Sequence, residues 1–405
     1  MTDPMVRASA ARIFRRRYRG RTPSLGIDLC SIRSLREPNE TYRAIRDAGR
    51  VVWLPRHRVW AMGRFEDVRA ALKDDDLFQS RDAVTFNAIQ RKVARGTTIG
   101  SDGDTHIRRR RILLQSLGGK ALRPLQPVLD VAAKDVVEEL LSLPSFDGVT
   151  DFASRLPISV ISDLVGAHVP DHLLLRWGRE AFDGNGPLTN LRVLRATPTA
   201  IRLWIYTARL NQSRVKKGSW ASAVLAAGER GELSRREAKN MVVDFIVPSL
   251  DTTILAASQL LWNLGDNPEA WDRLRRHPEL IPHAVVEAVR LASPVRAFTR
   301  ILARDTEIDG VTLRAGERVA LMFAAANTDE RQFPNALRFD LDRRGANVGW
   351  GYGAHACVGM HLSKLEMGAL LKAMVPRVKT ITVGQPRRLI NNGLQGLSAF
   401  QAAFC

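Results

Sequence analysis

The segment from Gly349 to Gly359, near the carboxyl end of the chain, holds residue types that could bind a metal. It reads Gly-Trp-Gly-Tyr-Gly-Ala-His-Ala-Cys-Val-Gly, and Cys357 precedes an apolar stretch that predicts a helix over Cys357–Val375. A thiolate at a helix start faces the positive end of the helix dipole and free backbone N–H groups. These lower its pKa and moderate its charge, as an axial ligand of iron requires. The alternating glycines permit positive φ, which would let a flat macrocycle lie against the backbone.

The remaining cysteines narrow this interpretation. Cys30 and Cys405 lie in no comparable pattern, so we expect them to be structural. Zinc is disfavoured because no second Cys or His lies at ligand spacing from Cys357; His355 is close but has no distant pair. Three cysteines in all are typical of a reducing compartment without a disulfide framework.

Three polar pairs upstream have spacings that let their members act together. They are His106 with Arg110, Asp251 with Thr252, and Glu287 with Arg290. Residues three or four apart share one helix face, although a Glu–Arg pair of this kind occurs on many surface helices. A carboxylate beside a hydroxyl can relay protons. The alternative for Thr252 is a hydrogen bond to the carbonyl four residues earlier.

These motifs, in this order and spacing, resemble those of the cytochrome P450 superfamily. The segment 349–359 matches its Phe-Gly-x-Gly-x-His-x-Cys-x-Gly loop except at the first position, where Trp350 stands. The resemblance covers roughly residues 35–400. It implies a haem b cofactor with Cys357 as the axial thiolate, in a loop that includes Gly351 and Gly359. Trp350 keeps an aromatic side chain beside the thiolate and adds an N–H donor. We expect this exchange to change the reduction potential of the iron only slightly.

The resemblance also implies roles for residues outside that loop. His106, Arg110, Arg300 and His355 would bind the haem propionates. Glu287 and Arg290 would form a structural pair locked by Arg338. Asp251 and Thr252 would serve the oxygen-binding groove, on a long helix expected over Ser234–Leu264. The family usually has Ala/Gly-Gly where this chain has Pro248-Ser249, and we expect Pro248 to kink that helix.

The expected substrate pocket is lined by Phe182, Asp244, Pro248, Val295 and Phe298, together with the loop 83–99. Residues 244, 248 and 252 share one helix face, so Asp244 could point into the pocket. It could bind a cationic or hydroxylated substrate, or it could pair with Arg91, Lys92 or Arg95, or form a structural ion pair at the helix flank. The aromatic lining favours a small apolar or aromatic substrate.

A basic face is expected on the cysteine side of the haem, where an acidic ferredoxin or flavodoxin with its reductase could dock. Its residues are Arg108, Arg109, Arg111, Arg343, Arg344 and Lys364. The surplus of charge could also attract nucleic acid, but no aromatic interleaving supports that use.

Helical spacing dominates the elements that must position these residues. We expect helices over 64–72, 106–117, 125–143, 156–165, 188–215, 234–264, 282–292 and 357–375, and short strands over 51–54, 59–62, 297–303, 318–323 and 379–383. Ser234 with Glu237 predicts a capping box. The chain is therefore mostly α with minor β, as in the triangular, α-rich single domain of the P450 fold. No window of 18 residues is continuously apolar, so no membrane anchor is expected.

The charge is unevenly placed. The 405 residues include 61 Lys and Arg against 42 Asp and Glu, a net charge of +19. Residues 1–21 hold seven of the arginines and one acid, and we expect them to form a disordered basic arm. Residues 22–405 are expected to form one domain, because no Pro/Gly-rich boundary divides them.

The sequence as a whole predicts a cytoplasmic, monomeric haem-thiolate monooxygenase. It would insert one oxygen atom from O2 into a small substrate, by hydroxylation or O-demethylation, with electrons from a ferredoxin. The alternatives are a haem-binding sensor or an inactive paralogue and, less favoured, a basic nucleic-acid-binding protein.

Overall fold

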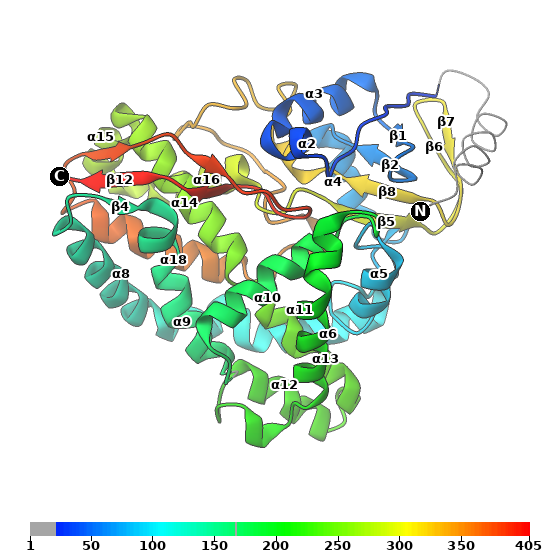
Figure 1. The fold of residues 1–405 in the computed structure, drawn as a ribbon, viewed down its shortest axis with the longest axis horizontal. Coiled ribbons are helices and arrows are strands. Elements are labelled where there is room, and N and C mark those ends of the chain that lie inside the picture. Colours follow the sequence, from blue (N-terminus) through cyan, green and yellow to red (C-terminus); the bar gives the residue numbers. More distant parts are fainter. Residues whose placement is uncertain (1–21, 167) are drawn as a thin grey trace.

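Helices make up most of the molecule and give it a roughly triangular outline, with small β-sheets along the upper edge in Figure 1. The computed structural model describes residues 22–166 and 168–405. The expected basic arm, residues 1–21, lies outside the described residues. The fold class predicted from the sequence, mostly α with minor β, is confirmed.

The amino-terminal half is a run of helices interrupted by four short strands. Its elements are α2 (Ile32–Arg36), α3 (Pro38–Ala48), β1 (Val52–Leu54), β2 (Val59–Met62), α4 (Phe65–Lys73), β3 (Phe78–Gln79), α5 (Ala88–Ala94), α6 (Gly103–Leu117), α7 (Gly119–Leu122), α8 (Gln126–Leu141), β4 (Phe146–Asp147), α9 (Arg155–Val165), α10 (Asp171–Asp183) and α11 (Leu191–Ala208).

The carboxyl-terminal half contains the central helices and most of the strands. Its elements are α12 (Trp220–Glu229), α13 (Arg235–Ile246), α14 (Asp251–Asp266), α15 (Pro268–Arg276), α16 (Ile281–Ala292), β5 (Phe298–Leu302), β6 (Thr306–Ile308), β7 (Val311–Leu313), β8 (Arg318–Leu321), α17 (Phe323–Asn327), α18 (Met360–Met374), β9 (Ile381–Val383), β10 (Arg387–Arg388), β11 (Leu397–Ala399) and β12 (Gln401–Phe404).

The largest sheet joins strands from the amino-terminal and the carboxyl-terminal halves of the chain. Its strand order is β1-β2-β8-β5-β3, and β2 pairs with β8 in parallel while the other neighbours are antiparallel. Alternate side chains of a strand point to the same face. Phe298 and Arg300 of β5 therefore face the interior cavity described below, and both line it.

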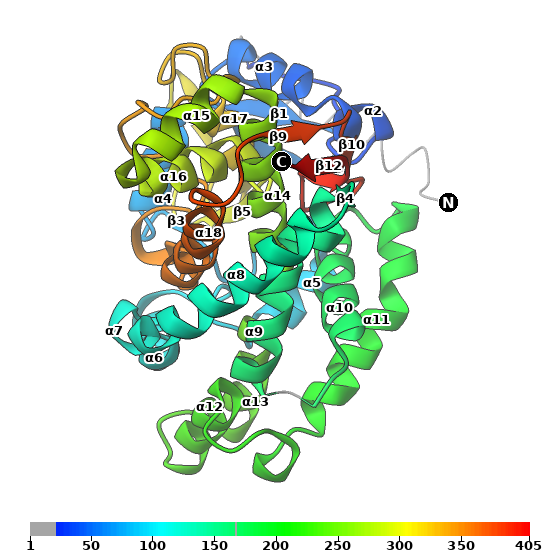
Figure 2. The same cartoon turned by 90° about the vertical axis from the view of Figure 1, so that its left-hand side faces the viewer.

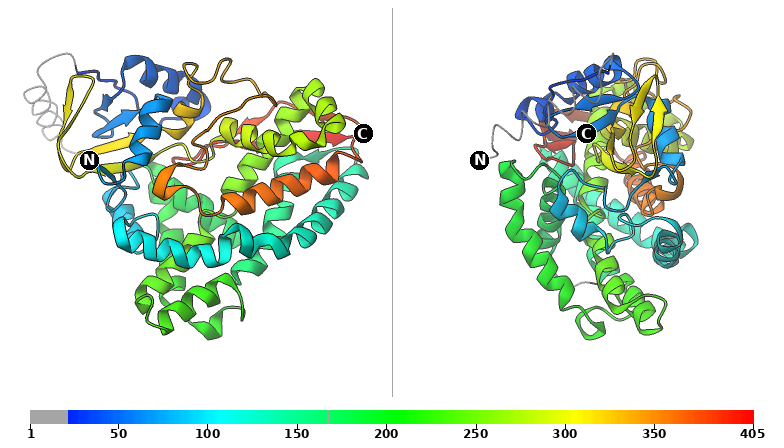
Figure 3. Two further views of the ribbon diagram at one scale, coloured as in Figure 1. Left: turned by 180° about the vertical axis from the view of Figure 1, so that it is seen from behind. Right: turned by 90° about the vertical axis from the view of Figure 1, so that its right-hand side faces the viewer.

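The helix α14 forms the centre of the largest apolar core. Eleven of its 16 residues are buried, as a helix with apolar residues on nearly every side requires. It contacts α16 and β9, while α18 packs on α8 and α16. Figure 3 shows α18 and α8 side by side when the molecule is seen from behind. This packing fixes α14 and α18, the two helices that flank the cavity described below.

The long helix expected over 234–264 is two helices, α13 and α14, separated by residues 247–250. Pro248 has no N–H to donate to the carbonyl of Asp244, so the expected interruption is confirmed but is wider than a kink. The hydroxyl of Ser249 donates to the Phe245 carbonyl, which satisfies one acceptor that the interruption frees. The capping box of Ser234 and Glu237 is confirmed at the start of α13.

Other boundaries differ modestly from expectation. The strand over Val59–Met62 is confirmed in full. The helix expected over 188–215 ends earlier, at Ala208, and a short 3-10 turn follows over Gln212–Arg214. No membrane-spanning helix was expected. The stretch Arg235–Asp266 is long and apolar enough by composition alone, but 67% of its apolar window is buried inside the protein, as suits a core helix.

Candidate active site

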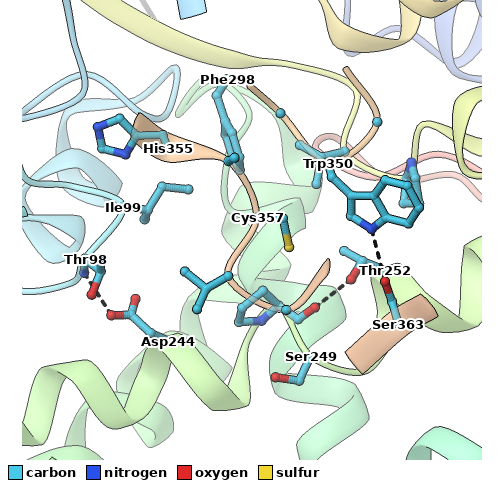
Figure 4. Close-up of a pocket in the computed structure, with 18 of the residues that line it drawn as sticks. Thr98, Ile99, Asp244, Ser249, Thr252, Phe298, Trp350, His355, Cys357 and Ser363 are labelled. Atoms are coloured by element: carbon cyan, nitrogen blue, oxygen red, sulfur yellow. Dashed lines mark hydrogen bonds between the residues drawn. The ribbon is translucent and has the colours of Figure 1, made fainter. Parts of the chain in front are cut away.

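One interior cavity gathers most of the residues singled out from the sequence. It contains about 1420 Å³ of empty space, including its open mouth. Part of its lining is drawn in Figure 4. The predicted residues that line it are His106, Arg110, Phe182, Asp244, Pro248, Thr252, Val295, Phe298, Arg300, Gly351, His355, Cys357 and Gly359. A space of this size admits a large planar group together with a small ligand.

The cysteine loop turns back on itself and presents its thiol to the cavity. Gly351 and Gly353 have φ of +69° and +68°, where only glycine is unstrained. A Cβ on Gly353 would lie 2.3 Å from the Leu72 carbonyl oxygen, so no side chain fits there. The Cys357 N–H donates to the Trp350 carbonyl at 2.7 Å, which closes the loop. The following helix starts at Met360, three residues later than expected.

The thiol of Cys357 faces the cavity, and the protein encloses both the thiol and the cavity. Burial therefore raises the pKa of Cys357, and the N–H groups of Gly359 and Met360 with the Arg110 guanidinium oppose this increase. The expectation of a lowered pKa is wrong for the protein alone, because burial outweighs the helix terminus. A metal cation on the sulfur would reverse the balance by favouring the thiolate.

Trp350 forms a wall beside the cysteine loop. Its indole N–H donates to the Ser363 hydroxyl at 3.0 Å, rather than to the sulfur. The Lys364 ammonium lies 4.8 Å from the centre of the indole ring, on α18. The extra donor brought by tryptophan thus ties the loop to α18.

Two arginines in the cavity have no acidic partner within ion-pair distance among the described residues. Arg300 is buried and donates only to the Thr299 carbonyl, at 3.0 Å, and burial lowers its pKa to about 10. Burial also lowers the pKa of Arg110. Buried cations are ordinarily paired, so this end of the cavity suits an anionic group. The haem propionates meet that requirement, and the residues present therefore fit the cofactor.

Two histidines adjoin these arginines. The rings of His106 and His355 lie 4.1 Å apart, and the Nε2 atom of His355 is 3.4 Å from the Asp102 carboxylate. Burial, followed by the charges of His355 and Arg110, lowers the pKa of His106 to about 4. His106 is therefore neutral near pH 7, so it can donate a hydrogen bond to an anion but contributes no charge.

The pair Asp251–Thr252 divides between two environments. The Thr252 hydroxyl lines the cavity and donates to the Pro248 carbonyl at 2.7 Å, the alternative raised by the sequence. Asp251 does not line the cavity. Its Oδ1 accepts from Arg179 Nη2 at 3.0 Å and Nε at 3.2 Å, while its buried Oδ2 has no partner among the described residues. Burial raises the pKa of Asp251.

The buried pair Glu287–Arg290 has a different third member from the one expected. Arg290 donates twice to Glu287, at 2.7 Å each, and Arg343 Nε donates to Glu287 at 2.9 Å. Arg338 is exposed, and only its carbonyl takes part, accepting from Arg290 at 3.4 Å. The prediction that the Arg338 side chain locks the Glu287–Arg290 pair is therefore wrong. The prediction that Arg343 belongs to the redox-partner face is also wrong, because its side chain binds Glu287.

The expected basic face is smaller than predicted. Arg109 is buried and donates to the Thr97 carbonyl and to Glu237, both at 2.9 Å, so it cannot meet a partner. Arg108 pairs with Glu237 at the same distance. Arg111 and Arg344 are exposed, and Lys364 is half-buried on Trp350. Of the predicted basic face, only these three side chains therefore stay accessible and outside an ion pair among the described residues.

Asp244 lines the cavity, and no cation in residues 22–166 or 168–405 forms an ion pair with it. Its Oδ2 accepts the Thr98 N–H at 2.8 Å (Figure 4). The expected alternatives are not formed, since Arg91 donates to the Phe86 carbonyl and Arg95 pairs with Asp82. Lys92 is exposed.

Sequence reasoning missed the bond of Arg179 to Asp251 and the role of Arg343 as the third member of the Glu287–Arg290 network. Arg179 lies on α10, 72 residues before its partner Asp251, and nothing in its local sequence marks it. The signal for Arg343 was its position shortly after the predicted Arg338, in a run with Arg344. A choice among neighbouring arginines needs the tertiary structure.

Comparison with known proteins gives consistent results. The family model described as Cytochrome P450 matches residues 211–398. Cytochrome p450 CYP199A2 of Rhodopseudomonas palustris is 29% identical over 384 residues, covering 93% of each chain. Mycinamicin IV hydroxylase/epoxidase of Micromonospora griseorubida is 30% identical over 337 residues, covering 81% of this chain and 84% of the relative.

Solved structures agree with these matches. Cytochrome P450 CYP268A2 of Mycobacterium marinum, in complex with pseudoionone, superposes with a TM-score of 0.82 at 25% identity, covering 94% of this chain and 99% of that one. The structure of CalO2 superposes with a TM-score of 0.79 at 25% identity, with the same two coverages.

Proposed function

This chain belongs to the cytochrome P450 superfamily and is an oxidoreductase of the monooxygenase type, and on that premise we propose how its residues act. It inserts one oxygen atom from O2 into a small organic substrate, by hydroxylation or O-demethylation. The observation that carries the proposal is the convergence of Cys357, the half-buried Arg110 and the buried Arg300 on one cavity, where neither arginine has an acidic partner among the described residues.

The haem b of this family binds through a cysteine thiolate, and we assign that ligand to Cys357. Arg110, Arg300 and His355 hold the propionates, and neutral His106 donates a further hydrogen bond. The close turn of Gly351 and Gly353 lets the macrocycle approach the backbone. When bound, the haem supplies oxygen activation, which thiolate ligation favours.

Protons reach the cavity through Asp251 and Thr252. Arg179 has a side chain that is 46% exposed, so it links the buried Asp251 to solvent. Burial raises the pKa of Asp251, which lets the carboxyl hold a proton for transfer. Gly178 leaves room beside Asp251 Oδ2, since a Cβ there would lie 3.0 Å away. The carboxyl rotates towards Thr252, whose hydroxyl then donates into the cavity instead of to Pro248.

The roof of the cavity selects a small, mainly apolar substrate. Phe182, Val295, Phe298 and Ile99 line it. Aromatic side chains supply large apolar area and exclude water. Among the relatives, the name of Linalool 8-monooxygenase of Pseudomonas putida gives linalool as its substrate. This supports the same substrate class here.

Electrons come from an acidic ferredoxin, or a flavodoxin, that docks on Arg111, Arg344 and Lys364. We further propose that residues 22–405 act as one domain and as a monomer in the cytoplasm, without binding nucleic acid. The largest core joins α14, α16 and α18, and the five-stranded sheet pairs β1, β2 and β3 with β5 and β8; both support one domain.

Replacement of Thr252 tests the proposed proton route. With a surrogate ferredoxin and its reductase, Thr252→Ala should form at least about tenfold less product per electron consumed, while electrons continue to be consumed. The matched control is Thr207→Ala on α11, because Thr207 makes the same bond, to the Leu203 carbonyl at 2.8 Å, and is not among the cavity-lining residues. Equal loss in both variants would refute the route. A wild-type protein that binds ligands but yields no product would instead favour a sensor.

A further inference from the structure

Asp244, near the end of α13, is the only acidic side chain among the described residues that line the cavity. We propose that it binds the positively charged nitrogen of a small cationic substrate, an inference that rests on the monooxygenase function proposed above. Thr98 is the only described residue that hydrogen-bonds to its carboxylate. That bond fixes the carboxylate with its other oxygen, Oδ1, free towards the cavity.

No cation among the described residues is paired with Asp244. Within the described residues, no ion pair includes it, and the arginines of α5 and its end make other bonds. The nearest charge is Arg109, which lies close enough to affect Asp244. The Arg109 guanidinium, however, donates to Glu237 and to the carbonyls of Thr97 and Arg95. The positive charge of Arg109 is therefore already paired with the Glu237 carboxylate.

The surroundings make an isolated carboxylate unfavourable. Apolar side chains such as Ile99, Phe182 and Phe298 line the same cavity. A charge in apolar surroundings is tolerated when an opposite charge meets it. Burial raises the pKa of Asp244 to about 6, although the N–H and side chain of Thr98 and the charge of Arg109 all act to lower it. The carboxylate is therefore ionised near pH 7 and only partly compensated, which leaves a place for a cationic ligand.

The cations elsewhere in the cavity have a separate role. Arg110 and Arg300 adjoin His106 and His355, where the haem propionates are proposed to bind. Figure 4 shows Asp244 beside Thr98 and Ile99, with the Cys357 thiol between this group and Trp350. A substrate held by its nitrogen at Asp244 would direct its apolar end away from α13. The oxidised carbon would then lie several bonds from the charged nitrogen.

Two ligands of equal shape isolate the effect of charge. Benzyltrimethylammonium carries a permanent positive charge, and neopentylbenzene replaces its nitrogen by carbon. The quaternary nitrogen has no lone pair, so it cannot bind the iron directly. Isothermal titration calorimetry on the wild-type holoenzyme should give at least about tenfold tighter binding of the cation, with phenylacetate binding more weakly than either. Equal affinity for the two isosteres would overturn the proposal without any variant.

The variant Asp244→Asn then assigns the preference to this residue. The amide keeps an oxygen that can accept the Thr98 N–H but removes the charge. The cation should bind at least about tenfold more weakly, while the affinity for neopentylbenzene changes less than about threefold. Asp135→Asn, an exposed acid on α8, makes the same change of net charge away from the cavity and should leave both affinities unchanged. If Asp244→Asn keeps the wild-type preference, the proposal is wrong.

The two proposals fail in different ways. Calorimetry reports binding whether or not the sulfur of Cys357 is the iron ligand, and the spectrum of the reduced carbon monoxide complex reports that ligand. A preparation with the thiolate spectrum but no preference for the cation refutes the role of Asp244 alone. A preparation with the preference but without the thiolate spectrum refutes the haem-thiolate assignment alone.

Discussion

At the scale of single residues, Glu287 accepts hydrogen bonds from both Arg290 and Arg343 in a place that water does not reach. The side chains of Glu287 and Arg290 are 4% and 1% exposed. Arg290 also donates to the carbonyls of Asn327 and Ala336, at 2.6 and 2.7 Å. The network therefore fastens α16 to the chain that leads towards the cysteine loop.

Removal of one partner from this network should be strongly destabilising. Arg343→Met leaves Glu287 with less compensation in a buried position, so the free energy of unfolding should fall by about 3 kcal/mol or more. Arg338→Met is the control, because the exposed Arg338 contributes only its carbonyl, and its effect should stay within about 0.5 kcal/mol. Urea unfolding of the holoenzyme measures both. If Arg338→Met lowers the free energy of unfolding more than Arg343→Met does, Arg338 has the structural role and this assignment is wrong.

Glu366 on α18 is a second residue whose burial has a measurable consequence. It is 1% exposed, and neither carboxylate oxygen has a partner among the described residues. Burial raises its pKa to about 8 from an ordinary value of 4.5. Between these values the folded protein holds a proton that the unfolded chain has released, so the contribution of Glu366 to stability falls as the pH rises.

The pH dependence of Glu366→Gln tests this consequence. The wild-type free energy of unfolding should decrease relative to that of the variant by up to about 1.4 kcal/mol per pH unit between pH 5 and about pH 8. Glutamine cannot ionise, so the variant lacks this component. Parallel stability curves for the two proteins over that range would show that Glu366 is paired or charged in the folded state.

At the scale of elements, the interruption between α13 and α14 places Thr252 in the cavity and Asp251 outside it. Pro248 lacks the N–H that would continue α13. The hydroxyls of Ser249 and Thr252 occupy the carbonyls of Phe245 and Pro248. Both the proline and these hydroxyls could therefore maintain the gap.

Pro248→Ala separates these two causes. If the proline is responsible, alanine restores a donor to the Asp244 carbonyl, amide hydrogen exchange over residues 247–251 slows, and stability rises by up to about 3 kcal/mol. Product formed per electron should then fall, because Thr252 moves. Pro198→Ala on α11 is the control, since Pro198 lies inside a helix that continues through it. Unchanged exchange in Pro248→Ala would assign the gap to the hydroxyls.

The elements also show what the sequence could predict. The cysteine loop was predictable because its glycines and Cys357 act through local backbone geometry, and Gly351 and Gly353 do have positive φ. The interruption at Pro248 was predictable for the same reason. The direction of Asp251 was not, because its position depends on Arg179, which reaches it from α10. The burial of Arg109 likewise depends on Glu237 of another helix, α13.

At the scale of the whole molecule, the net charge of +19 is the most unusual property. Seven arginines and one acid lie in residues 1–21, so most of the surplus belongs to residues 22–405. Figure 2 shows α6 and α18 on one side of the molecule and α11 on the other. Arg111 on α6 and Lys364 on α18 therefore lie apart from α11, and electrostatic steering towards them can be tested separately.

The rate of reduction by an acidic ferredoxin should depend steeply on salt. Charges more than about 8 Å apart are screened at 0.15 M ionic strength, so the second-order rate constant should fall at least about tenfold from low salt to that value. Arg111→Glu and Arg344→Glu should each slow reduction several-fold at low salt. Arg202→Glu, exposed on α11, makes the same change of charge and should have little effect. Stopped-flow rates that do not change with salt would contradict docking by charge.

The measurement that tests the central claim most directly is the absorption spectrum of the reduced holoprotein under carbon monoxide. A cysteine thiolate from Cys357 predicts a Soret band at about 450 nm, which Cys357→Ser should lose while other haem absorption remains. A folded, haem-loaded wild-type protein without that band, or a serine variant that keeps it, would contradict the account.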